Sequence, residues 1–235
     1  MTIGSTGRLI ALLILCTPLF GQESGVVPYL SFPRPLEQGT LNYSLGASMT
    51  IFPRFVVEEE IRQIPMVLVS ARYGLPSNFS LTAQFSTVYI TNALSAGTMW
   101  SHDLFGIHAA LTDEFVYWFG IADLEGFNTN AMGIVNRPGI SAGIDVDNYL
   151  VTLRSELLIL ISQHTYFGSA SVGRVKPEVA GVTTSLTLEQ DLWNKTFMSF
   201  SLRANIARPN YQLWLAFSVQ DRWILYPEIQ MSFLF

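Results

Sequence analysis

The chain has 235 residues, of which 49% are hydrophobic and only 13% are charged, and its formal net charge is −5. That charged fraction is about half the value for ordinary globular proteins, which indicates that part of the surface faces an apolar medium. The negative balance lacks the basic surface that nucleic acids bind, so no nucleic acid partner is expected. The length suffices for one sizeable domain.

Residues 1–22 have the pattern of a secretory signal peptide. Arg8 precedes an apolar stretch over residues 9–20, and small or polar residues follow it. The one cysteine, Cys16, lies inside this segment, so cleavage leaves a mature chain without thiols and excludes disulfide and cysteine–zinc frameworks. A lipoprotein anchor at Cys16 is the weaker alternative, because residues 13–15 lack the small side chains that such a cleavage site needs.

Residues 23–39 are interpreted as a lead-in segment or an irregular first strand. Pro28, Pro33 and Pro35 prevent an ordinary central strand there. From residue 40 the pattern changes, because apolar side chains then occupy every second position up to residue 51. Only a strand with one apolar and one polar face explains this period of two.

The same alternation recurs to the end of the chain. Strands are expected over residues 40–51, 66–73, 79–91, 99–111, 115–122, 140–146, 149–161, 179–188, 197–206, 211–219 and 223–235. Tight turns are predicted at residues 74–78, 112–114 and 147–148, and longer loops at residues 53–63, 125–138 and 163–177. Short and long connections roughly alternate, as in a barrel with tight turns on one rim and loops on the other.

The closing stretch, residues 223–235, alternates apolar and polar side chains and ends in an aromatic residue, Phe235. This stretch resembles the closing strand of bacterial outer-membrane β-barrels, whose terminal Phe is read by the barrel-assembly machinery. The resemblance implies that Phe233 and Phe235 form the assembly signal. It also implies a location in the outer membrane of a Gram-negative bacterium, with membrane lipid, lipopolysaccharide and the assembly machinery as partners.

The predicted fold is therefore all-β: a single transmembrane antiparallel β-barrel over residues 40–235. No apolar run reaches the roughly 20 residues of a membrane-spanning helix. About eleven strand-like segments can be found, whereas bacterial single-chain barrels have an even number of strands. Twelve strands are favoured, with ten as the alternative. The same parity conflict leaves open which loops are external, because a periplasmic Phe235 puts the turn at residues 74–78 on the unexpected side.

Aromatic side chains lie near many of the expected strand ends on the apolar face, where such rings prefer a membrane interface. They are Tyr43, Tyr73, Phe79, Phe115, Tyr117, Tyr149, Phe197, Tyr211, Trp223 and Phe235. A soluble barrel would need a lid to cover these rings, and no helical segment is predicted that would provide one.

The alternation turns several charged or polar side chains toward the barrel interior: Arg72, His108, Arg154, Glu156, Arg203 and Glu228. Buried charges persist only when they are paired. A network of salt bridges that fills a narrow barrel is therefore favoured over a charged lining that selects what passes.

No metal, cofactor or catalytic site is expected. His102 and His108 share a face of one expected strand but lie about 20 Å apart along it, too far to bind one metal. Ser101 and His102 are adjacent and point to opposite faces, and no G-x-S-x-G motif occurs. Residues 145–148 are interpreted as a hairpin turn rather than a calcium loop, and the acidic run at residues 58–60 as a solvated loop.

The expected function is that of a narrow, porin-like channel or passive transporter for a small solute. The alternative is a plugged barrel with a structural or surface-interaction role, in which the loops at residues 53–63, 125–138 and 163–177 do the work. A membrane-embedded lipid-modifying enzyme is the third and least favoured hypothesis.

Overall fold

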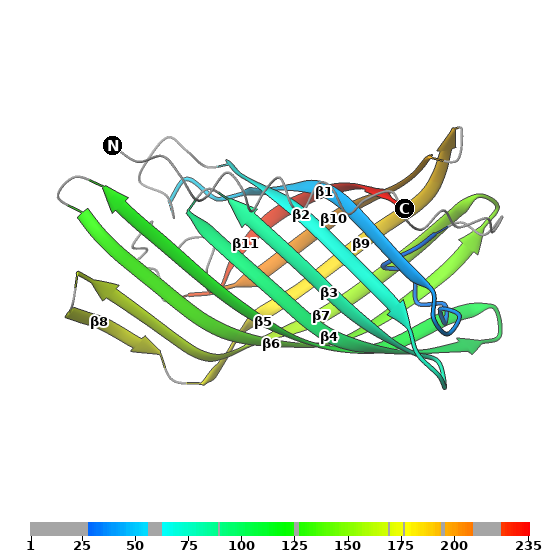
Figure 1. The fold of residues 1–235 in the computed structure, drawn as a ribbon, viewed down its shortest axis with the longest axis horizontal. Coiled ribbons are helices and arrows are strands. Elements are labelled where there is room, and N and C mark those ends of the chain that lie inside the picture. The colour runs from blue at the N-terminus through cyan, green and yellow to red at the C-terminus, as the bar shows by residue number, and fades with distance from the viewer. Residues whose placement is uncertain are drawn as a thin grey trace.

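The computed structural model describes residues 28–55, 63–88, 90–124, 127–168, 170–175, 177–193, 196–208 and 222–235. The described strands form an all-β antiparallel barrel, in which tilted strands lie side by side around a central lumen (Figure 1). The strands are β1 (Leu41–Ile51), β2 (Gln63–Gly74), β3 (Phe79–Val88), β4 (Thr91–Leu104), β5 (Ile107–Leu124), β6 (Phe127–Val146), β7 (Tyr149–Phe167), β8 (Ala170–Val175), β9 (Glu178–Trp193), β10 (Thr196–Ala207) and β11 (Ile224–Leu234). Within the described residues, no helix is long and apolar enough to cross a membrane.

Every strand except β8 belongs to a closed ring. Of the eleven strands, β8 pairs only with the far end of β7, so the ring itself has ten. The ring runs from β1 through β7 in chain order, continues through β9, β10 and β11, and returns to β1. All pairings between neighbours are antiparallel, which fits the short connections between consecutive strands.

The seam between β1 and β11 seals the ring at the C-terminus. The two strands pair from Ser44 opposite Leu234 to Thr50 opposite Glu228. Beyond them, Phe235 N–H donates to the Tyr43 carbonyl at 2.8 Å, and Tyr43 N–H donates to the Phe235 carbonyl at 3.1 Å. The rings of these two residues stack with centroids 5.4 Å apart. The closing role predicted for the last strand is confirmed.

Side chains alternate between the lumen and the outer wall, as the period of two predicts. On β9, Thr183, Ser185, Thr187 and Glu189 are buried inside, whereas the Leu186 side chain between them is 49% exposed on the outside. Large apolar side chains are exposed on the outer face of the strands all around the ring. The barrel therefore has an apolar outer wall and a largely polar interior.

The two rims of the barrel differ in their connections. The rim called the turn rim here carries Phe235, residues 75–78, 105–106 and 147–148, and the ends of β9 and β10 at Trp193 and Thr196. The opposite rim, called the loop rim, has the remaining ends of the described strands. Tight turns with positive φ occur on the turn rim at Ser77, Asn78, Phe105, Gly106 and Asp147, and Gly168, between β7 and β8 on the loop rim, also has a positive φ. The C-terminus and the turn at residues 75–78 thus share one rim. The conflict between a periplasmic Phe235 and the side expected for this turn therefore does not arise.

The favoured count of twelve strands is wrong for the ring, and the alternative of ten is confirmed. Of the twelve expected strands, the lead-in shows no strand over residues 28–38. The strand expected at residues 211–219 lies outside the described residues. β10 pairs directly with β11 from Phe197–Leu234 to Ala207–Ile224, so these two strands are neighbours in the ring.

Three expected boundaries are also wrong. The strand expected over residues 99–111 is a hairpin, in which Phe105 and Gly106 form the turn with φ of 51° and 89°. A two-residue turn of this kind usually has Asn or Asp at its first position, so an aromatic residue hid it. The turn expected at residues 112–114 lies inside β5, and most of the loop expected at residues 125–138 belongs to β6.

Residues 28–38 contain no strand and lie in the lumen at the turn rim; they are called the plug here. The plug joins β1 through Gly39 and Thr40, where Gly39 N–H donates to the Gly74 carbonyl at 3.0 Å and Gly74 N–H donates to the Thr40 carbonyl at 2.9 Å. Phe32 of the plug is fully buried. The first described part of the chain therefore enters the barrel before the barrel wall begins.

Candidate functional site in the barrel lumen

The most tightly bonded part of the lumen is the contact between Glu189 and the plug. Glu189 lies on the inner face of β9 and has no exposed surface. Its Oε1 accepts the backbone N–H groups of Leu30 at 2.7 Å and Ser31 at 3.0 Å, and its Oε2 accepts that of Phe32 at 2.8 Å. Three successive amides thus converge on one carboxylate, which is the pattern of an anion-binding backbone concavity.

Arg72 binds the same segment from the inner face of β2. Its guanidinium donates to the carbonyls of Phe32 at 2.6 Å, Arg34 at 2.8 Å and Leu30 at 3.4 Å. These carbonyls belong to residues two positions apart in a bent segment, and the several N–H groups of one planar guanidinium reach all three. Arg72 and Glu189 therefore bind the plug through its main chain and with opposite charges.

Apolar packing and two further hydrogen bonds also hold the plug in the lumen. Tyr29, Phe32 and Leu36 form a buried cluster with Leu150 of β7. The Tyr29 hydroxyl donates to the Pro35 carbonyl at 2.8 Å, and burial raises the pKa of this hydroxyl, which keeps it a donor. Asn42 of β1 donates to the Tyr29 carbonyl at 2.8 Å. The plug is therefore ordered by its own contacts as well as by the barrel wall.

Midway along the lumen, four charged side chains form a continuous network. Glu114 of β5 accepts Arg137 of β6 at 2.6 Å and Arg154 of β7 at 3.0 Å. Arg154 also donates to Glu156 at 2.7 Å. The side chains of Glu114 and Glu156 are 9% and 3% exposed, so these carboxylates depend on the arginines for their charge balance.

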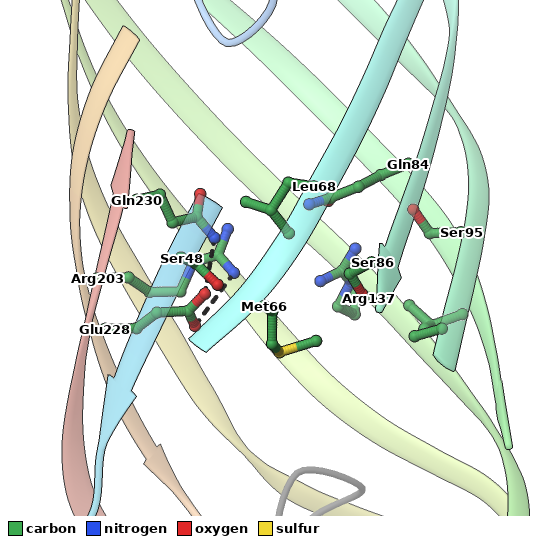
Figure 2. A pocket seen from close by; sticks show the side chains of 12 residues that line it. Ser48, Met66, Leu68, Gln84, Ser86, Ser95, Arg137, Arg203, Glu228 and Gln230 are labelled. Carbon is green, nitrogen blue, oxygen red and sulfur yellow. Dashed lines mark hydrogen bonds and ion pairs between the residues drawn. The ribbon is translucent and has the colours of Figure 1, made fainter. Parts of the chain in front are cut away.

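A second, looser charged group lies on the other side of the lumen. Arg203 of β10 and Glu228 of β11 face each other across paired positions, with Nη1 and Oε2 3.6 Å apart. Gln230 donates to Glu228 at 2.8 Å. Figure 2 shows these three side chains gathered together, with Arg137 and Ser86 among the other residues around the same pocket.

Polar side chains enclose two small cavities beside these charges. One of about 100 Å³ is lined by Arg72, Arg154, Arg203, Glu114 and several Ser, Thr and Gln side chains. Another of about 20 Å³ lies next to Arg137, Arg203 and Glu228 (Figure 2). The larger cavity has room for several water molecules or one small polar solute.

Toward the loop rim the interior becomes apolar. Trp118 of β5, Tyr226 of β11 and Phe52 after β1 belong to one buried cluster, which also includes Leu158 and Leu160 of β7. Trp118 and Tyr226 come from opposite walls of the ring and are at most 1% exposed. The described side chains thus place an apolar layer, a charged polar layer and the plug in succession along the lumen.

The structure places the residues selected from the sequence as follows. Arg72, Arg154, Glu156, Arg203 and Glu228 point into the lumen, and Arg154 is brought against Glu156 and Arg203 against Glu228. His108 lies at the turn rim, bonded to Asp103 and with its ring 4.9 Å from that of Phe32. Phe233 and Phe235 lie on the outer wall, 43% and 55% exposed.

Three central residues of the lumen are not predicted by the sequence pattern. The sequence predicts a turn at Glu114 and a loop at Arg137, because the expected strand ends there differ from the observed ones. Glu189 lay on the polar face of a correctly expected strand, but a single acidic residue in such a position carries no further signal. The contact between Glu189 and the plug joins residues more than 150 positions apart. No local sequence pattern indicates such a contact.

No group of three or more His, Cys, Asp or Glu residues in the described part of the chain is placed to bind a metal ion. His102 and His108 do not share a face as expected, because Asp103, not His102, pairs opposite His108 in the β4–β5 hairpin. Ser101 is buried beside Arg72, while the His102 side chain is exposed.

Comparisons with known proteins give only a distant similarity. No protein-family profile and no curated protein sequence matches the chain. Among solved structures, the translocator domain of autotransporter NalP from Neisseria meningitidis is similar with 12% identity and a TM-score of 0.42, over 83% of this chain and 87% of that one. CdiB from Acinetobacter baumannii is similar with 9% identity and a TM-score of 0.36, over 72% of this chain and 32% of that one. This chain thus matches about a third of CdiB, and neither description is carried over to it.

Proposed function

We propose that this protein is an outer-membrane β-barrel of a Gram-negative bacterium, and that small polar solutes pass through its lumen, which is closed in the conformation described above. The closed ring with an apolar outer wall supports the membrane location, because a water-soluble protein rarely exposes so large an apolar surface. Tight turns and the C-terminus share one rim, and the longest connections, between β1 and β2 and between β10 and β11, join strand ends at the other rim. This arrangement is typical of such barrels, in which the turn rim faces the periplasm. The aromatic seam at Phe235 supports recognition by the barrel-assembly machinery.

The charged polar layer of the lumen carries the transport part of the proposal. The cavity of about 100 Å³ beside Arg72, Arg154 and Glu114 is lined by hydrogen-bonding groups. A lining with both cationic and anionic groups suits a small polar or zwitterionic solute better than a strongly charged one. The plug lies at one end of the charged polar layer and the apolar layer lies at the other, so passage requires at least one of them to move.

Planar lipid bilayers test this function. We expect the purified full chain to be silent for most of the recording and to show infrequent discrete conductance steps, because the plug and the apolar layer must leave the lumen for ions to cross. A continuously open pore would contradict the closed lumen. Complete silence over a wide range of salt and voltage would contradict the passage of solutes.

A plugged structural barrel is the second candidate function, and the plug is the observation that favours it. A segment bonded to both Arg72 and Glu189 suits a lumen that stays filled, while the loops on the loop rim contact other molecules. Complete silence in bilayers, with the membrane location intact, would support this second candidate. Neither candidate includes a catalytic step, and we propose no enzymatic activity for the chain.

The membrane location predicts a specific effect at the outer wall. Replacing Leu186, which lies halfway along β9 and is 49% exposed, with Arg is expected to destabilise the barrel in lipid vesicles by about 2–4 kcal/mol, because the cation then faces the bilayer interior. Denaturant-induced unfolding in vesicles measures this change. Asn148→Arg, in an exposed turn of the turn rim, is the matched control and should change the stability by no more than about 0.5 kcal/mol. Equal effects of the two substitutions would argue against burial of the outer wall in lipid.

A further inference from the structure

Arg72 and Glu189 are the two buried charges of the lumen that form no ion pair within the described residues. Arg72 is 1% exposed and Glu189 has no exposed surface, yet the described ion pairs of the lumen involve Glu114, Glu156 and Glu228 with other arginines. A buried charge without compensation is costly. Here the compensation comes from the plug, whose amides face the carboxylate and whose carbonyls face the guanidinium.

The barrel wall is shaped to receive this segment. At Gly143 of β6, an added Cβ would lie 2.7 Å from atoms of both Phe32 and Pro33, so a larger residue would push the plug out of its seat. Arg34 of the plug also forms an ion pair of 2.6 Å with Asp145, two residues farther along the same strand. The position of the plug is therefore determined by the shape and charge of the barrel wall as well as by the plug itself.

The polar contacts that bind the plug to Arg72 and Glu189 are of a kind that water can replace. Six hydrogen bonds to Arg72 and Glu189 involve the main chain of the plug, and both charges would be hydrated if the segment left and water entered. By contrast, the plug is attached to the wall at its C-terminal end by the backbone bonds between Gly39, Thr40 and Gly74. Gly39 has a φ of 85°, and a Cβ added to it would have no other atom within 4 Å, so nothing packs against this residue on that side. The segment can therefore swing while its end stays fixed.

We propose that residues 28–38 are a displaceable gate, held by its main chain between Arg72 and Glu189 and attached at Gly39, whose release opens the polar cavity of the lumen toward the turn rim. The role of this gate rests on the proposed passage of solutes, but the experiment that tests the gate does not depend on that proposal. The gate recognises no particular solute, because the two charges contact backbone atoms. Whatever weakens either charge therefore shifts the gate toward its released position.

Thiol accessibility tests the gate in the full chain. The reporter is Ser70→Cys, which lines the cavity of about 100 Å³, in a Cys16→Ser background. A charged, water-soluble thiol reagent should modify this cysteine about 100-fold more slowly than a cysteine at Asn148, in an exposed turn of the turn rim, because modification needs local opening. Adding Glu189→Gln or Arg72→Gln should raise the rate at Ser70→Cys about tenfold or more, since hydrogen bonds to charged groups are lost.

Glu228→Gln is the matched control, because Glu228 is also a buried carboxylate of the lumen but does not contact the plug. It should leave the rate at Ser70→Cys unchanged. Folding of each variant is checked by its faster gel mobility before heating and by its circular dichroism. A folded Glu189→Gln variant with an unchanged rate would overturn the gate, as would a Ser70→Cys reporter that reacts as fast as the turn cysteine. These outcomes do not depend on conductance, so failure of the gate and failure of solute passage are distinguishable.

Discussion

Replacing Glu114 with Gln is expected to destabilise the barrel by about 3–5 kcal/mol, as measured by denaturant unfolding in lipid vesicles. Glu114 accepts Arg137 at 2.6 Å and Arg154 at 3.0 Å, and its side chain is 9% exposed. Gln keeps the shape of the side chain but removes the negative charge. Two arginines then share a buried region in which Glu156 is the remaining carboxylate of the network.

The matched control for this prediction is Glu178→Gln. Glu178 forms an ion pair of 2.6 Å with Arg208 near the loop rim, but the two side chains are 35% and 34% exposed. An exposed pair contributes about 0–1 kcal/mol because water and salt screen it. If both substitutions cost the same small amount, the lumen around Glu114 is hydrated enough to screen its charges, and the network does not stabilise the fold.

Replacing Gly46 with Val is expected to prevent most of the chain from forming the closed barrel. Gly46 lies in β1 directly opposite Ser232 of β11. A Cβ at this position would overlap the Met231 carbonyl oxygen and the Ser232 hydroxyl. Overpacking usually costs about 1–3 kcal/mol, and here the clash involves backbone of the seam that closes the ring, so we expect a cost at or above the upper end of that range.

The faster gel mobility of the folded barrel before heating measures the folded fraction of this variant. Ala47→Val is the control, because Ala47 is the next residue of β1 but is exposed on the outer wall. This control should fold like the unchanged chain. A Gly46→Val variant that folds fully would mean that the β1–β11 seam tolerates a shift in register, contrary to the tight pairing described above.

How far the sequence predicts this protein varies along the chain. For β1, β9, β10 and β11 the expected strands overlap the observed ones closely, because apolar and polar side chains alternate there without interruption. The expectation failed around residues 105–114, where Phe105 occupies a positive φ that aromatic residues seldom adopt. Because the turn was expected at residues 112–114, Glu114, the centre of the charged network, was not predicted to face the lumen.

The sequence by itself determined the class of fold and the facing of most side chains, because the direction of a side chain in a strand depends only on local backbone geometry. It also indicated the closing role of the last strand. The tertiary structure alone decided the number of strands in the ring, the position of residues 28–38 inside the lumen, and the partners of Arg72, Glu114 and Glu189. Those features depend on which distant strands lie next to one another and in what register, and that is settled only when the ring closes and brings opposite walls within bonding distance.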